Sequence, residues 1–316
     1  LVIEAMLQSP YFLYRTELST AVEGDVIPLS PYEVASRLSY FAWNTMPDDA
    51  LFAAAGDGSL ASEEGVRTQA ERLLRSERAV DVGERFHMQL LDIERWSGIR
   101  PATGTFPEAP SGLAGLAQTE ASHFLREIVW NDDAGLVGLL TSSETFVNEE
   151  TAPLYGLPAT DYGAAFERTM LDGERRRGML TQLGFLASHA TSRDPDPIHR
   201  GIFIATRIAC LPVPAPPDMI PELPAPMGMT NRETIESLTE VEGSVCAGCH
   251  ATLINPFGFP FEHYDAVDGF RDDDNGFTID ATSAPVLDGA AQPVDGAIDL
   301  AETLAASPSV HRCYAR

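Results

Sequence analysis

The pentapeptide Cys246-Ala-Gly-Cys249-His250 contains the residue types that attach a c-type haem. In this pattern the two thiols form thioether bonds to the porphyrin, and the imidazole ligates the iron. Two cysteines on one helical turn, followed directly by a histidine, can hold one edge of the ring while the histidine nitrogen meets the metal. The pattern therefore predicts one covalent haem c, with His250 as the proximal iron ligand.

Two other kinds of chemistry use a Cys-x-x-Cys pair. A zinc ribbon needs a second closely spaced pair, whereas Cys210 and Cys313 each stand alone in the sequence. A thioredoxin-like dithiol follows a strand and opens a helix, whereas the run before Cys246 has the pattern of helix and loop. The sequence favours haem c, and both alternatives stay open at this point.

The second axial ligand decides what a haem iron does. Two strong protein ligands make an electron carrier, whereas an open distal position permits chemistry on peroxide or oxygen. No methionine follows His250 in these residues, so the downstream distal methionine of small cytochromes is not available. The candidates for the distal position are His189, Met219, Met227, Met229, His263 and His311, with His87, His123 and His199 as outsiders.

Four residues near the motif are assigned further roles. His189, at the end of an expected helix, is predicted to be the distal ligand or a distal acid–base group; the alternative is a helix-terminal histidine that caps carbonyls. Arg200 is predicted to pair with a haem propionate, with an ordinary salt bridge as the alternative. Asn255 and Pro256 are expected to pack against His250 and orient its ring through the second nitrogen.

Composition limits the partners. The chain has 316 residues, 44% of them hydrophobic, which is enough for one large or two ordinary domains. Its formal net charge is −26, and all 21 basic residues are arginine. Nucleic acid and anionic membrane surfaces are therefore poor partners, whereas a basic redox protein would be attracted. No apolar run reaches the ~18 residues that a membrane-spanning helix needs.

The cysteines outside the motif indicate an oxidising compartment. Haem c is attached outside the bacterial cytoplasm, and Cys210 and Cys313 remain to form a disulfide there. Two separate free thiols are the alternative. The chain starts at Leu1 without a signal peptide, and its first residues have a helical pattern, so we expect a processed product or a fragment. The expected location is periplasmic or extracellular.

Helical patterns dominate the sequence. Ser30-Pro31-Tyr32-Glu33 is a capping box, and Asp196-Pro197 and Thr230-Asn231-Arg232-Glu233 start further helices. Asn275-Gly276 predicts a small hairpin, and the proline-rich segment 211–229 is expected to run as an extended strap. Other helices are expected over residues 2–17, 48–55, 63–75, 78–95, 112–131, 174–189, 296–306 and 308–316.

We therefore predict a mostly α-helical fold with three modules. Residues 1–172 form a helical scaffold, and residues 173–265 form a cytochrome c-like haem module that includes the strap at 211–229. Residues 266–316 form a small acidic module with the hairpin and the terminal helices. The acidic run Asp272-Asp-Asp-Asn-Gly276 does not match the spacing of an EF-hand calcium loop, so we expect it to be the hairpin tip.

Several phrases, in order along the chain, resemble the planctomycete- and myxobacterium-type cytochrome-like family of secreted multidomain proteins. They include Gln8-Ser-Pro-Tyr-Phe-Leu-Tyr-Arg15, Thr145-Phe-Val-Asn-Glu149, Pro197-Ile-His-Arg-Gly201 and Asn255-Pro-Phe-Gly-Phe259. The resemblance implies a single haem site and secretion, and members of the family usually continue past the position of Arg316. Many relatives carry methionine and aspartate before the proline that follows the haem motif, whereas this chain has Ile254-Asn255.

Three functions follow from these patterns. The first is electron transfer through the haem to a redox partner protein. The second is a haem-dependent, peroxidase-like oxidoreductase with an open distal site, in which His189 and Arg193 act as acid–base and charge-stabilising groups. The third is a structural subunit of an extracellular, haem-containing assembly, either a homo-oligomer or a hetero-oligomer.

Overall fold

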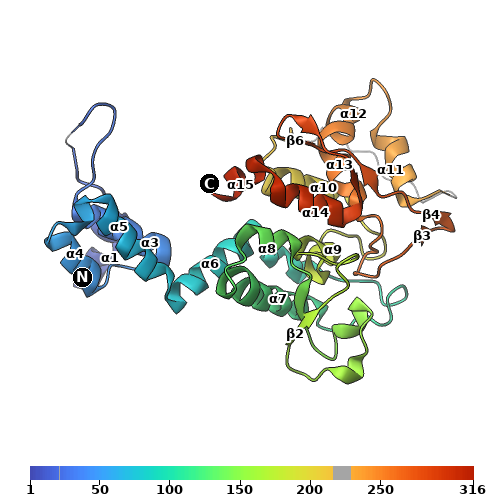
Figure 1. Cartoon of the computed structure of the whole chain (residues 1–316), viewed down its shortest axis with the longest axis horizontal. Coiled ribbons are helices and arrows are strands. Elements are labelled where there is room, and N and C mark those ends of the chain that lie inside the picture. Colours follow the sequence, from blue (N-terminus) through green and yellow to red (C-terminus); the bar gives the residue numbers. More distant parts are fainter. Residues whose placement is uncertain (21, 216–228) are drawn as a thin grey trace. The chain divides into compact units, whose positions relative to one another are not determined.

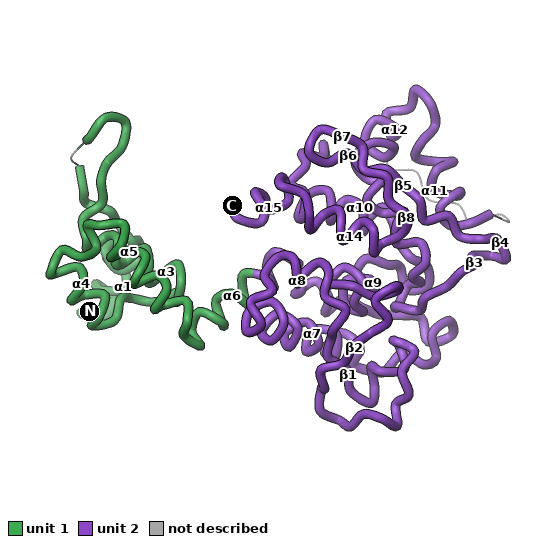
Figure 2. Tube along the Cα trace, in the orientation of Figure 1, with its two compact units in different colours: residues 1–86 green, residues 87–316 purple. Residues whose placement is uncertain are grey.

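The computed structural model describes residues 1–20, 22–215 and 229–316. The described chain is mostly α-helical with short antiparallel strand pairs, which confirms the predicted fold class (Figure 1). It forms two compact units, residues 1–86 and residues 87–316 (Figure 2). No described helix is both long enough and apolar enough to cross a bilayer.

The first unit is helical and has its own small core. Its elements are α1 (Val2–Leu7), α2 (Pro10–Leu13), α3 (Pro31–Trp43), α4 (Asp49–Gly56), the 3-10 turn η1 (Ser59–Ala61) and α5 (Glu63–Leu74), and α6 (Glu77–Leu90) continues into the second unit. The core packs around the buried side chains of Ala35, Leu51 and Leu73. The predicted capping box of α3 is present, because Ser30 accepts from the Glu33 backbone and the Glu33 carboxylate accepts from the Ser30 backbone.

The single helix expected over residues 2–17 is wrong. The first helix ends at Leu7, a second one runs only over Pro10–Leu13, and residues 14–17 are not helical. Proline has no N–H to continue the hydrogen bonds of a helix, but its fixed φ suits the first helical position. Pro10 therefore interrupts the expected helix and starts a new one.

The second unit carries Cys246–His250, the predicted haem motif. Its helical elements are η2 (Ile93–Gly98), α7 (Leu113–His123), η3 (Phe124–Asn131), α8 (Gly135–Thr141), η4 (Ala152–Tyr155), η5 (Ala159–Asp161), η6 (Met179–Thr181), α9 (Leu183–Ser188), α10 (Pro197–Phe203), η7 (Ile204–Ile208), α11 (Asn231–Thr239), α12 (Val245–Cys249), η8 (His250–Ile254), α13 (Asn255–Gly258), η9 (Phe259–Phe261), α14 (Gly296–Ala306) and α15 (Pro308–Tyr314). η3, η7 and η8 are π-helical and the other η elements are 3-10 helices.

The strands form short antiparallel pairs. β1 (Glu144–Val147) pairs with β2 (Glu167–Met170), β3 (Asp273–Asp274) with β4 (Phe277–Thr278), β5 (Thr282–Ser283) with β8 (Val294–Asp295), and β6 (Val286–Leu287) with β7 (Ala290–Ala291). The hairpin predicted at Asn275-Gly276 is the β3–β4 pair. Its two turn residues have φ values of 53° and 84°, as a tight hairpin turn requires.

One continuous hydrophobic core fills the second unit. It contains Phe124 and Leu139 from before residue 172, Phe185 and Phe257 from the expected haem module, and Leu300 from the expected C-terminal module. Helix α14 packs against α8, as the red and green ribbons in Figure 1 show. The division into three modules stays a prediction. The described residues from 87 onward, which belong to all three predicted modules, share one hydrophobic core.

The helix expected over residues 174–189 is wrong in its first half. Only Leu183–Ser188 is α-helical, and the chain before it turns. Gly178 has a φ of +63°, and a Cβ at this position would lie 2.1 Å from the Leu140 carbonyl oxygen. The backbone therefore approaches α8 in a conformation that favours glycine, which is incompatible with a helix through this point.

The predicted disulfide between Cys210 and Cys313 is present. The two Cα atoms lie 5.7 Å apart, and the bridge closes a sequence separation of 103 residues. It joins the chain just after η7 to α15, as expected for a link from the C-terminal helix to the segment before the haem motif. Residues 211–215 of the predicted proline strap have no regular secondary structure, and the strap at 216–228, with Met219 and Met227, lies outside the described residues.

Candidate functional site

The haem motif occupies a short helix near the surface. The hydroxyl of Ser244 caps α12 by accepting from the Ala247 N–H at 3.1 Å, which fixes where the helix begins. The helix carries Cys246 and Cys249, and both thiols are free and half-buried. Beside them, Val245 is 82% exposed. A pair of reachable thiols next to an exposed apolar side chain is a surface that a porphyrin edge can cover.

His250 follows as the first residue of η8, and its ring is held by one hydrogen bond. Nδ1 lies 3.1 Å from Oδ1 of Asn255, the first residue of α13. The direction of this bond depends on which end of the Asn255 amide faces the histidine. The other contacts of Asn255 decide this.

The Asn255 side chain is buried, and its amide nitrogen faces two acceptors. One is Thr239 Oγ1 at 3.1 Å, whose own hydrogen is donated to the Ile235 carbonyl. The other is the Glu240 carboxylate at 2.7 Å, which can only accept when ionised. Nδ2 must therefore face these two atoms, so Oδ1 faces His250 and accepts from its Nδ1–H.

This tautomer leaves the lone pair of His250 on Nε2. A neutral imidazole that donates from one nitrogen presents the other as a metal ligand, and the hydrogen bond also fixes the ring orientation. The sequence predicted the contact from Asn255, and Pro256 beside it is half-buried. Thr239 and Glu240 were not predicted, because no spacing rule links the end of α11 to a histidine in another helix.

Close backbone packing places Asn255. A Cβ at Gly201 of α10 would lie 2.1 Å from the Ile254 carbonyl oxygen, and a Cβ at Gly258 of α13 would lie 1.9 Å from the Pro197 carbonyl oxygen. Only glycine permits so close an approach of α10 and α13. The phrases Pro197-Ile-His-Arg-Gly201 and Asn255-Pro-Phe-Gly-Phe259 thus meet in space, and this contact supports the residue that orients His250.

His189 occupies the position of the capping alternative. Its Nδ1 lies 3.0 Å from the Phe185 carbonyl oxygen at the end of α9, and its ring packs against the rings of Phe185 and Phe203. Burial lowers the pKa of His189 to about 4, so the ring is neutral near pH 7. Among the described residues, no hydrogen bond or ring contact joins His189 to His250. A distal role for His189 therefore stays a prediction.

Arg200 makes no salt bridge with the described residues, and its predicted pairing with a haem propionate stays a prediction. Its side chain is 0% exposed, and its guanidinium donates to the carbonyl oxygens of Leu186, Phe261, Tyr264 and Asp265 at 2.9–3.1 Å. Burial lowers its pKa to about 10. A guanidinium surrounded by backbone carbonyls holds the turn after η9.

The other candidate axial ligands that the structure describes have local partners or lie half-buried. His263 contacts the Arg271 carbonyl, His311 the Ala305 carbonyl, His87 the Tyr314 hydroxyl, and His199 the Asp196 carboxylate. His123 stacks on Phe146, and Met229 is half-buried at the end of the strap. Within residues 1–20, 22–215 and 229–316, no group of three or more His, Cys, Asp or Glu side chains is arranged to hold a metal ion.

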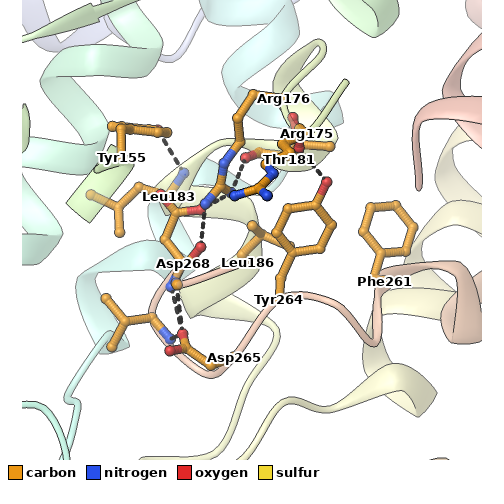
Figure 3. Close-up of polar contacts among 12 residues, drawn as sticks. Tyr155, Arg175, Arg176, Thr181, Leu183, Leu186, Phe261, Tyr264, Asp265 and Asp268 are labelled. Carbon is orange, nitrogen blue, oxygen red and sulfur yellow. Dashed lines mark hydrogen bonds and ion pairs between the residues drawn. The ribbon is translucent and has the colours of Figure 1, made fainter. Parts of the chain in front are cut away.

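A second polar cluster lies in the core of the same unit (Figure 3). The Arg176 guanidinium pairs with the Asp268 carboxylate and also donates to the Thr181 carbonyl at 3.1 Å. Its carbon lies 4.8 Å from the centre of the Tyr264 ring, and the Tyr264 hydroxyl donates to the Arg175 carbonyl at 2.5 Å. Both members of the ion pair are buried.

Glu120 continues this cluster on its other side. Its Oε1 accepts from Thr145 at 2.5 Å and from Tyr155 at 2.6 Å, whereas its Oε2 has no hydrogen-bond partner among the described residues. Burial raises the pKa of Glu120 to about 7 and the pKa of Asp268 well above its ordinary range. Asp268 pairs directly with the Arg176 guanidinium, whereas Glu120 interacts with that guanidinium only at longer range, so ionisation of both carboxylates would leave a net negative charge in this cluster.

Two family models match the chain one after the other. Residues 29–157 match PSD4, a protein of unknown function (DUF1592), and residues 176–274 match PSCyt3, a protein of unknown function (DUF1588). The haem motif lies in the second match. No curated protein and no solved structure matches the chain. Two successive segments of the chain are therefore similar to families of unknown function.

The buried cluster joins these two segments. The Gln182 amide donates to Thr145 at 3.1 Å, and the Leu183 backbone N–H donates to the Tyr155 hydroxyl at 2.9 Å. Each bond connects a residue of the second matched segment to one of the first. The predicted haem motif, in contrast, is supported by contacts with α10, α11 and α13, which all lie within the second matched segment.

Proposed function

We propose that this chain is a mono-haem c-type cytochrome-like protein that transfers electrons outside the cytoplasm. The proposal rests on the orientation of His250, which follows the two free thiols of Cys246 and Cys249 in the sequence. Its Nδ1–H donates to Asn255, so its Nε2 can bind iron. The name of the second family model, PSCyt3, points the same way because Cyt abbreviates cytochrome.

The residues present fit a haem c. Cys246 and Cys249 would hold it through thioether bonds, His250 would be its proximal ligand, and Asn255 would keep the imidazole in the ligating tautomer. Haem supplies one-electron redox chemistry when it is bound. The exposed side chains of Val241 and Val245 offer apolar surface on either side of the capping Ser244.

The disulfide and the charge support the rest of the proposal. A bridge between Cys210 and Cys313 fits an oxidising compartment such as the periplasm or the extracellular space. A net charge of −26 would speed the encounter with a basic redox partner and make the rate fall with ionic strength. Electron transfer requires a redox partner, because a carrier accepts and donates electrons when it binds another redox protein.

Expression in a bacterial host that attaches haem c tests the proposal. The wild-type protein should gain the mass of one haem under denaturing conditions and show the spectrum of a reduced haem c, whereas Cys246→Ser/Cys249→Ser should bind none covalently. The double variant Cys210→Ser/Cys313→Ser is the matched control, because it removes two cysteines outside the motif and should keep the haem. A wild-type protein without covalent haem would exclude the proposal.

The reduced protein then separates electron transfer from catalysis. A carrier should show a six-coordinate, low-spin spectrum that carbon monoxide and peroxide leave unchanged. A high-spin spectrum that changes with peroxide would instead support the peroxidase-like oxidoreductase. A protein that forms regular polymers and exchanges no electrons with small redox proteins would support the structural subunit.

A further inference from the structure

Glu240 makes the shorter of the two contacts that the Asn255 amide nitrogen forms behind His250. It is half-buried at the end of α11, and its carboxylate lies 2.7 Å from Asn255 Nδ2, compared with 3.1 Å for the neutral acceptor Thr239 on the same nitrogen. Hydrogen bonds to an ionised acceptor are shorter and stronger than those to a neutral one. Among the described residues, no arginine or histidine pairs with Glu240, so its charge is not neutralised locally.

The amide of Asn255 transmits this charge. A carboxylate that accepts from Nδ2–H polarises the amide and increases the negative charge on Oδ1, because hydrogen bonds in a chain strengthen one another. Oδ1 in turn accepts from Nδ1–H of His250 at 3.1 Å. A stronger bond at Nδ1 makes Nε2 more electron-rich and therefore a better ligand for the oxidised metal.

We infer that Glu240 is a positioning residue that lowers the reduction potential of the haem by acting through Asn255 on His250. This inference rests on the proposed function. Asn255 is held by two acceptors, one charged and one neutral, so the part played by charge can be separated from the part played by orientation. Nearby Glu242 is exposed and makes no hydrogen bond or ion pair with the described residues.

Redox titration of the haem-loaded variants tests the inference. Glu240→Gln keeps an acceptor oxygen but loses the charge, and it should raise the midpoint potential by about 59 mV, a tenfold change in the ratio of reduced to oxidised protein. Glu242→Gln removes a charge two residues away that has no contact with Asn255, and its shift should be several-fold smaller. Thr239→Val removes the neutral acceptor and should also shift the potential less than Glu240→Gln.

The outcomes separate the inference from the proposed function. Equal shifts in Glu240→Gln and Glu242→Gln, with haem attached in both, would overturn the inference alone, because the effect would then be one of net charge. A shift of Thr239→Val as large as that of Glu240→Gln would also overturn it, because orientation would then outweigh charge. A wild-type protein without covalent haem would overturn the proposed function and the inference together.

Discussion

The haem motif and the Arg176–Asp268 cluster lie in the same unit but are built in opposite ways. The motif lies on short helices with half-buried thiols and an exposed valine, and its internal support is one line of hydrogen bonds through Asn255. The cluster is buried: its Arg176 guanidinium pairs with Asp268, and its Glu120 carboxylate accepts from Thr145 and Tyr155. The thiols of the motif are accessible to an incoming ligand, whereas the cluster pairs a buried guanidinium with a buried carboxylate.

This difference shows that a strongly shifted pKa need not mark a functional site. Perturbed groups are often catalytic, but buried ion pairs perturb their members just as strongly. Burial raises the pKa of Glu120 to about 7, and its hydrogen bonds lead to other residues of the core. The cluster is best understood as a polar joint between two segments that match different family models.

The sharpest test of the joint is Arg176→Ala. Removing the guanidinium leaves Asp268 buried and unpaired, and we expect the free energy of unfolding to fall by about 3–5 kcal/mol. Urea unfolding followed by circular dichroism measures this. Arg175→Ala is the matched control, because the neighbouring exposed side chain makes a surface ion pair with Asp172 at 3.8 Å and should cost less than about 1 kcal/mol. Similar losses in both variants would show that the cluster is not a stabilising joint.

The next effect is the pH dependence of stability. The pKa of Glu120 in the folded protein, about 7, lies above its ordinary value of 4.5. Its contribution is therefore fully present below pH 4.5 and is lost as the pH rises through 7. Between pH 5 and pH 8, the free energy of unfolding of the wild type should fall by on the order of 2–3 kcal/mol because of Glu120. Glu120→Gln should lack this part of the fall. Parallel pH profiles of the two proteins would refute the buried proton on Glu120.

A smaller effect is expected at the start of the haem-motif helix. Ser244→Ala removes the cap of α12 and should cost about 1 kcal/mol in local stability. Because the helix is short and near the surface, amide hydrogen exchange in α12 is the suitable measurement. Exchange in α14, in the core of the same unit, should not change. Faster exchange in both helices would mean that the motif is not energetically separate from the core.

The smallest effect on folding stability should come from replacing Cys246 and Cys249, the two cysteines of the predicted haem motif. In protein without haem, Cys246→Ser/Cys249→Ser should change the free energy of unfolding by less than about 0.5 kcal/mol, because both thiols are half-buried and free. Urea unfolding measures this beside Arg176→Ala. A loss of several kcal/mol would show that the thiols belong to the core.

Local signals in the sequence predicted much of the fold. The capping boxes at Ser30 and Thr230, the Asp196 cap before Pro197 and the Asn275-Gly276 turn each lie where expected, because caps and tight turns depend on residues within a few positions of one another. The continuous helices expected over 2–17 and 174–189 were wrong, because a proline and a close backbone contact at Gly178 interrupt the apolar periodicity.

In the candidate site, too, local features could be predicted from the sequence and contacts between distant segments could not. The sequence by itself predicted the pairing of Cys210 with Cys313, because they are the cysteines outside the motif, and Asn255 as the partner of His250, because the two residues are close in the chain. The covalent haem stays a prediction from the Cys246–His250 pattern. Only the tertiary structure decided that Glu240 and Thr239 fix the amide of Asn255, that Arg200 serves the backbone, and that Arg176 meets Asp268. These contacts join helices and turns that are distant in the chain, and no periodicity encodes which buried charges will meet.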